Sequence, residues 1–248
     1  MLNIIAARVK QGYRTSAFPK VEPQLPDRFR GLPSVDLAKC PSGCAECVEA
    51  CPTDAIRIGD GVQIDLGRCL FCTACMDACP EGAIQFSNDY RLATRTRSAL
   101  HFDGKALQLA TALSGRIHAL YGRSLRLREV SAGGCNGCEA EVNVLSTIAF
   151  DLSRFGISIV ASPRHADGLI ITGPVSKNMQ EALRITYDAI PSPKIVIAVG
   201  ACAISGGPFM DHQEVCNGAE STVPVDLYVP GCPPHPFTIL DGILRILK

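Results

Sequence analysis

The stretch Cys69-Leu-Phe-Cys72-Thr-Ala-Cys75-Met-Asp-Ala-Cys79-Pro80 decides how the N-terminal part of this chain folds. It belongs to an internal repeat, because Cys51-Pro-Thr-Asp-Ala-Ile-Arg-Ile58 recurs as Cys79-Pro-Glu-Gly-Ala-Ile-Gln-Phe86, each copy after three closely spaced cysteines. A duplicated unit this short has almost no aliphatic core, so something else must hold it together. Bound metal can do so, because its binding free energy becomes folding free energy.

The spacing of these cysteines indicates an iron–sulfur cluster rather than a single metal ion. The pattern C-x2-C-x2-C-x3-C-P is that of bacterial 4Fe–4S ferredoxins, in which three thiolates bind one cluster and the fourth binds the other. Structural zinc sites, the alternative, prefer two well-separated cysteine pairs. We therefore expect two crossed ligand sets, one of Cys69, Cys72, Cys75 and Cys51, the other of Cys40, Cys44, Cys47 and Cys79.

The first cysteine run departs from this pattern. Three residues, Pro41-Ser-Gly43, separate Cys40 from Cys44, where the second run has two. Gly43 can absorb the additional residue in a left-handed turn, which glycine adopts without steric strain. Cys40 is consequently the ligand whose place in its set depends most on the local backbone.

The composition narrows the class of protein. Thirteen cysteines in 248 residues are too clustered for a secreted disulfide scaffold, and the N-terminal residues show no secretory signal. We expect reduced thiolates in a cytoplasmic protein. Acidic and basic side chains balance at 24 each, which argues against nucleic acid or an anionic membrane as the main partner. No apolar stretch approaches the ~18 residues of a membrane-spanning helix.

The pattern along the chain predicts four segments. They are an N-terminal extension at 1–35, a two-cluster α+β ferredoxin-like domain at 36–90, a connecting helix at 91–124 and an α/β domain at 125–248. In the extension, Leu2, Ile5 and Val9 stand at helical spacing beside Arg8 and Lys10. Such a helix suits a membrane surface, a partner or its own protein, and the sequence leaves these alternatives open.

The α/β domain is predicted from apolar runs that alternate with helical patterns. The expected strands are 125–130, 157–161, 168–172, 194–199 and 225–229, and the expected helices lie near 139–154, 177–190 and 236–247. Unbroken apolar runs such as Ile195–Val199 suit strands that are buried on both faces. They predict a parallel sheet covered by helices, which is an open α/β fold of flavodoxin type.

A third cysteine set is expected in this domain, made of Cys135 and Cys138 in a C-x-x-C pair, Cys202 and Cys232. Each segment follows an expected strand, and the carboxyl ends of parallel strands lie along one edge of a sheet, where ligands bind. Neighbouring glycines let the backbone approach a bulky cluster closely. We expect a third 4Fe–4S cluster here, and Cys216, the thirteenth cysteine, as a spare thiol.

Several strings in the α/β domain resemble those of a known family. Residues 125–248 resemble the small subunit of group 4 nickel–iron hydrogenases, the energy-converting and formate hydrogenlyase type, which is related to the B subunit of respiratory complex I. The matching strings are Gly133-Gly-Cys-Asn-Gly-Cys-Glu139, Ser162-Pro-Arg-His-Ala-Asp167, Gly200-Ala-Cys202 and Pro230-Gly-Cys-Pro-Pro234. Residues 1–90 resemble the two-cluster ferredoxin-like subunit of the same assemblies, including Phe29-Arg-Gly-Leu-Pro33.

This resemblance implies an electron-transfer subunit of a membrane-associated nickel–iron hydrogenase. Its three 4Fe–4S clusters would relay electrons between a catalytic large subunit and a low-potential donor or acceptor. No catalytic residue is expected in this chain, because the resemblance places the active-site metal in the large subunit. Together with other subunits of the complex, the protein would lie on the cytoplasmic face of the cell membrane.

Two other functions are weighed against this one. Complex I-type B subunits present adjacent cysteines at the first ligand position, whereas two residues separate Cys135 from Cys138, as in the hydrogenase branch. A quinone-reducing complex I relative and a free-standing ferredoxin-like carrier are the alternatives. Glu139 and Glu141 stand at an expected helix start, where acids are favoured, and His165 lies in an expected loop. A proton-transfer role for these three residues stays open.

Overall fold

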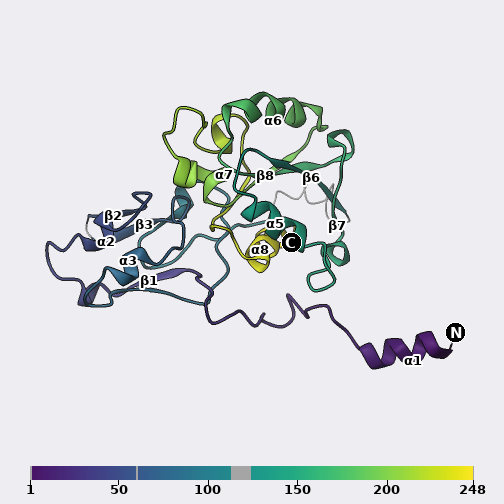
Figure 1. The fold of residues 1–248 in the computed structure, drawn as a ribbon, viewed down its shortest axis with the longest axis horizontal. Helices are drawn as coiled ribbons and strands as arrows, with labels where there is room; N and C mark the ends of the chain where they lie inside the picture. The colour runs from purple at the N-terminus through teal and green to yellow at the C-terminus, as the bar shows by residue number, and fades with distance from the viewer. Residues whose placement is uncertain (1, 60, 113–123, 248) are drawn as a thin grey trace.

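The structure, a computed structural model, describes residues 2–59, 61–112 and 124–247. Figure 1 shows a larger body of sheet and helices beside a smaller body, with helix α1 (Leu2–Gln11) standing apart from both. The smaller body contains the cysteine repeat, and the larger contains the chain from residue 125 onward. None of the helices in the described ranges is long and apolar enough to cross a membrane.

The smaller body is built from short elements that follow the sequence repeat. Its strands form two antiparallel sheets, β1 (Pro33–Val35) with β4 (Ile84–Phe86), and β2 (Ile56–Ile58) with β3 (Val62–Asp65) and β5 (His101–Phe102). A four-residue helix ends each cysteine run, α2 (Glu46–Glu49) before β2 and α3 (Ala74–Asp77) before β4. The two copies of the repeat therefore fold alike.

The larger body is a five-stranded parallel sheet with helices. Its strands are β6 (Leu125–Ser131), β7 (Ile157–Ile159), β8 (Gly168–Thr172), β9 (Ile195–Val199) and β10 (Leu227–Val229). They lie in the order β7-β6-β8-β9-β10, which is the flavodoxin order 2-1-3-4-5. The helices are α5 (Gly137–Val144), α6 (Lys177–Ala189), α7 (Ala201–Ser205) and α8 (Pro236–Leu247). The predicted fold class is confirmed.

One expected helix of this domain is shorter than its apolar pattern predicts. The pattern covers 139–154, but α5 ends at Val144, and Leu152–Phe155 forms a separate 3-10 turn. The Thr147 hydroxyl donates to the carbonyl of Val144 at 2.7 Å. Such a side-chain bond offers the backbone an alternative to helical pairing, so the chain turns here.

The connecting helix expected over 91–124 does not form in residues 91–112, and residues 113–123 lie outside the described residues. Thr94 instead exchanges two backbone hydrogen bonds with Tyr228 of β10, at 2.9 and 3.0 Å. The Arg95 guanidinium donates to the carbonyl of Asp226 at 2.9 Å. The segment thereby covers backbone groups at the edge of the sheet that would otherwise lack partners.

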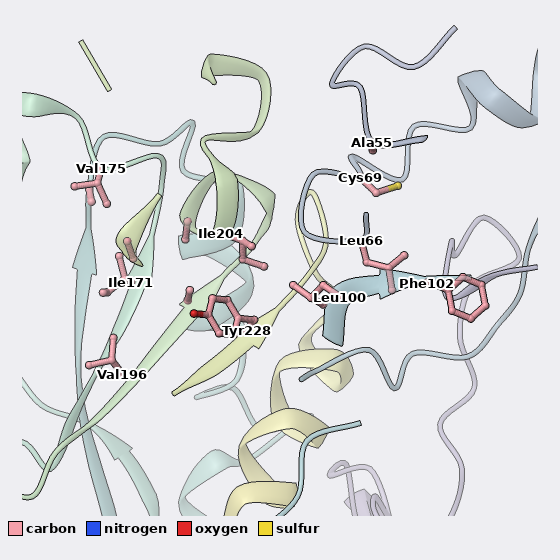
Figure 2. Packing of buried hydrophobic residues seen from close by; sticks show 14 of the residues in the cluster. Ala55, Leu66, Cys69, Leu100, Phe102, Ile171, Val175, Val196, Ile204 and Tyr228 are labelled. Atoms are coloured by element: carbon pink, nitrogen blue, oxygen red, sulfur yellow. The ribbon is translucent and has the colours of Figure 1, made fainter. Parts of the chain in front are cut away.

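One cluster of buried hydrophobic side chains joins the two bodies. Figure 2 shows Leu100 of the smaller body beside Ile204 and Tyr228 of the larger one, within one cluster of buried side chains. The buried Ser205 hydroxyl donates to the carbonyl of Gly67 at 2.9 Å across the same join. These contacts fix the position of the cysteine repeat relative to the sheet.

Candidate iron–sulfur cluster sites

The two copies of the repeat hold Cys51 and Cys79 in the same way. The amide of Ala55 donates to Cys51 Sγ, and the amide of Ala83 to Cys79 Sγ, both at 3.2 Å. The residue before each alanine has a positive φ, namely Asp54 (49°) and Gly82 (58°). Amide hydrogen bonds to sulfur are among the interactions that set the potential of a bound cluster.

Four cysteines from both runs line one cavity of the smaller body, together with Ile56, Ile64 and Phe86. They are Cys51, Cys69, Cys72 and Cys75. Burial raises the pKa of Cys69 to about 12 and that of Cys75 to about 11, and the other cysteines of the cavity add to both shifts. The structure therefore brings together Cys69, Cys72 and Cys75 of the second run with Cys51 of the first run, as the crossed assignment expects.

The other expected set, of Cys40, Cys44, Cys47 and Cys79, also meets in space. Burial raises the pKa of Cys47, and Cys40, Cys44 and Cys79 raise it further by electrostatic repulsion. Gly43 has a φ of 79°, which is the left-handed turn expected from the longer spacing, and the space around its Cα is open. The turn thus keeps Cys40 beside Cys47 despite the additional residue.

The third set gathers at the carboxyl edge of the sheet. Cys135 and Cys138 follow β6, Cys202 lies in α7 directly after β9, and Cys232 follows β10. Burial raises the pKa of Cys138 to about 12, and Cys202, Cys232 and Cys135 raise it further in that order. Burial also raises the pKa of Cys202 to about 11. All four expected members of this set are therefore neighbours.

Two glycines make room for the sulfurs of this third set. A Cβ on Gly200 would collide with Cys138 Sγ, and one on Gly207 would lie 2.8 Å from Cys202 Sγ. Both glycines also have positive φ, 90° and 55°. The backbone passes so close to these thiols that no larger residue fits without displacing them.

The donor chemistry of the three sets fits iron–sulfur clusters. Buried thiols that repel one another are costly to ionise, and bound iron removes that cost because its positive charge stabilises the thiolates. Among the described residues, no three His, Cys, Asp or Glu side chains are grouped closely enough to hold a single metal ion. In a cubane cluster each of the four ligands binds a different iron atom. The four thiols therefore need to lie near one another but do not need to meet at a single metal ion.

Glu129 of β6 is a buried acid that sequence reasoning missed. Its Oε1 is buried without a hydrogen-bond partner among the described residues. Burial raises the pKa of Glu129 to about 7, with a further contribution from Glu139. In the sequence Glu129 looks like an ordinary strand residue. Its burial could not be predicted, because it depends on how α5 and α6 pack beside the sheet.

The remaining residues singled out in the sequence lie around the third set or away from it. Glu141 lines the same cavity as Cys232, and burial raises the pKa of Glu141. His165 is exposed in the 3-10 turn Pro163–His165. Cys216 lies in a loop, where its amide donates to the carbonyl of Val175 at 2.8 Å.

Comparison with known proteins matches both parts of the chain. Residues 135–246 match the family described as "NADH ubiquinone oxidoreductase, 20 Kd subunit". Residues 39–83 match a 4Fe–4S dicluster domain. The cysteines of all three sets fall within these two matched regions.

Three relatives illustrate the range of this similarity. A "Probable membrane-bound hydrogenase subunit mbhJ" of Pyrococcus furiosus is 43% identical over 51% of this chain and 76% of its own length. Formate hydrogenlyase subunit 7 of Escherichia coli is 46% identical over 50% of this chain and 49% of its own. The B subunit of the NADH-quinone oxidoreductase of Desulfovibrio desulfuricans is 39% identical over 62% of this chain and 90% of its own.

These similarities confirm the resemblance inferred from the sequence. The chain belongs to the family that the 20 kDa subunit of NADH–ubiquinone oxidoreductase shares with these hydrogenase subunits, and a dicluster 4Fe–4S domain precedes that part of it.

Proposed function

We propose that this chain is the electron-transfer subunit of a membrane-associated nickel–iron hydrogenase complex. The observation that carries the proposal is the C-x-x-C pair of Cys135 and Cys138, gathered with Cys202 and Cys232 at the carboxyl edge of the sheet. The relative from Pyrococcus furiosus, of which 76% is covered, is named as a hydrogenase subunit. The chain would work between a catalytic large subunit and a low-potential electron donor or acceptor.

The chain would hold three 4Fe–4S clusters through twelve of its thirteen cysteines. The three ligand sets are Cys40, Cys44, Cys47 and Cys79; Cys51, Cys69, Cys72 and Cys75; and Cys135, Cys138, Cys202 and Cys232. Each bound cluster exchanges single electrons at a potential that its surroundings determine. The chain's own part is to bury the thiolates and to donate amide hydrogen bonds to them.

Two pairs of sets lie within electrostatic reach of each other, an arrangement that suits a relay. Cys47 of the first set adds to the pKa shift of Cys75 in the second, and Cys72 of the second set adds to that of Cys232 in the third. Leu100 and Ile204 belong to one cluster of buried side chains at the join between the two bodies. This packing would keep the spacing between the sites from depending on an extended linker.

A partner subunit is expected to cover the third set. Cys135 and Cys232 are exposed, whereas Cys202 is buried. A cluster held by exposed thiolates is open to water and oxidants, and a permanent neighbour at this edge removes that access. We propose that the large subunit docks here and that the whole complex is attached to the cytoplasmic face of the membrane.

A complex I-like quinone oxidoreductase is the second candidate function. It is favoured by the Desulfovibrio desulfuricans relative, which is named as part of an NADH-quinone oxidoreductase and is covered over 90% of its length. The two-residue gap between Cys135 and Cys138 favours the hydrogenase function instead, because the quinone-reducing branch places these cysteines side by side.

Metal analysis of the anaerobically purified complex separates the two functions. We expect about twelve irons for each copy of this chain and nickel in the copurified large subunit. A content of about eight irons for each chain would mean that one of the three proposed clusters is absent. A complex that lacks nickel and reduces quinone would overturn the hydrogenase function in favour of the second candidate.

A further inference from the structure

Helix α1 is left uncovered by the two bodies. Residues Asn3–Gln11 are exposed throughout, and Figure 1 shows the helix projecting away from the rest of the molecule. The chain rejoins the larger body at Ser16, whose amide donates to the carbonyl of Ala149 at 2.9 Å. Phe18 is then buried against Tyr90 and Phe237.

The helix has one apolar stripe with a cation on each side. At about 100° per residue, Ile5 and Val9 share one face, and their exposed fractions are 61% and 77%. Arg8 lies about 80° from this stripe in one direction, and Lys10 lies about 120° from it in the other. Ile4 lies about 120° from the stripe, beyond Arg8 and outside the apolar face, so it serves as the control position.

The surrounding sequence carries only positive charge. Residues 1–21 contain Arg8, Lys10, Arg14 and Lys20 and no acidic residue, although acids and bases balance at 24 each over the whole chain. Tyr13 is 90% exposed, and the Arg8 guanidinium lies 4.8 Å from the centre of its ring. An aromatic ring with a polar end, beside a cation, is typical of the water–lipid interface.

We propose that α1 binds flat on an anionic lipid surface, with Ile5 and Val9 in the interface and Arg8 and Lys10 at the lipid phosphates. Charge complementarity favours a bilayer over a groove in another protein, because a groove would need acidic walls on both sides of a narrow stripe. Long basic side chains reach outward from an apolar surface in this way. This lipid-binding proposal depends on the proposed electron-transfer function in one respect only, the location of the protein at a membrane.

The connection to the body is short enough to hold the protein near that surface. Gly12, with a φ of 63°, ends the helix, and four residues at 12–15 lead to Ser16. Four extended residues span at most about 14 Å. The cluster-bearing bodies would therefore lie directly above the bilayer.

The test is flotation of the iron-loaded full chain with vesicles. One preparation contains phosphatidylcholine alone, and the other contains equal parts of phosphatidylcholine and phosphatidylglycerol. We expect binding to the anionic vesicles at least about tenfold stronger, and weaker at high salt. Replacing Arg8 and Lys10 together by alanine should weaken it about twentyfold or more, at roughly fivefold for each charge removed.

A matched pair of variants tests the apolar face. Ile5→Asp and Ile4→Asp change the charge equally, but only Ile5→Asp places a carboxylate in the stripe. We expect Ile5→Asp to abolish flotation and Ile4→Asp to leave most of it. The proposal would be overturned if Ile5→Asp and Ile4→Asp reduced flotation equally, or if the wild-type chain bound both kinds of vesicle equally. It would also be overturned if the chain self-associated and Ile5→Asp removed that self-association.

Binding of α1 to another protein instead of to lipid would give different results in these experiments. In that case α1 would gain protection from proteolysis only in the assembled complex, with no flotation of the chain itself, and the lipid proposal would fail. Iron content and reduction by soluble dyes should stay unchanged in all these variants. Loss of flotation is therefore distinguishable from failure of the proposed electron-transfer function.

Discussion

Cys72 and Cys232 lie within electrostatic reach of each other across the join between the two bodies. The pKa of Cys232 is raised first by the partial burial of its thiol, then by Cys135 of its own set, and then by Cys72. The second and third cysteine sets therefore face each other through one residue from each body. The packing of that join sets the distance over which the proposed relay works.

Gly67→Ala should destabilise the join. A Cβ at Gly67 would lie 2.7 Å from the Cγ2 of Ile204 and 2.9 Å from the guanidinium carbon of Arg97. Overpacking of this kind costs about 1–3 kcal/mol, measurable as a lower free energy of unfolding in denaturant. Gly59→Ala is the control, because a Cβ at Gly59 meets nothing within 4 Å. Equal effects of the two substitutions would contradict the tight packing at Gly67.

The crossed ligand assignment is tested by a pair of equivalent cysteines. Cys79→Ser should damage the cluster on Cys40, Cys44 and Cys47, and Cys51→Ser should damage the cluster on Cys69, Cys72 and Cys75. The reason is the grouping of each cysteine with the other run. Electron paramagnetic resonance of the two variants gives the answer. Loss of the opposite cluster in each variant would refute the crossing.

Gly200→Ala should prevent the third cluster from binding. Its Cβ would collide with Cys138 Sγ, and alanine is strained at a φ of 90°. Iron content should fall from about twelve to about eight for each chain. Gly43→Ala also places alanine at a positive φ, 79°, but its Cβ meets no neighbouring atom, so this variant should keep all its iron. Full iron content in Gly200→Ala would count against the third site.

The local spacing of residues predicted which cysteines lie together better than it predicted the segment that connects the two bodies. The grouping of Cys51 with Cys69 follows from residues close in sequence, and β8 and β9 follow from continuous apolar runs that are buried on both faces. The segment after residue 90 could not be predicted in this way. The partner of Thr94 is Tyr228, which is distant in sequence, and only the finished sheet brings them together.

Glu129 should make stability depend on pH. Its pKa is about 7 in the folded protein because of burial and Glu139, against an ordinary value of 4.5. Between these values the folded state holds a proton that the unfolded state has released, so stability falls as the pH rises through this window. Glu129→Gln removes the effect. The variant should gain stability over the wild type at about pH 8 and differ less at about pH 5, by thermal unfolding. A larger gain at the lower pH would contradict the buried, protonated acid.

The central claim is that this chain receives electrons from, or delivers them to, a hydrogen-activating partner. Reduction of its clusters by hydrogen gas alone, followed by electron paramagnetic resonance in the intact complex, tests this most directly. We predict that hydrogen reduces the clusters of the wild-type chain. Clusters that remain oxidised under hydrogen, yet pass electrons to quinone once a strong chemical reductant has reduced them, would contradict the account.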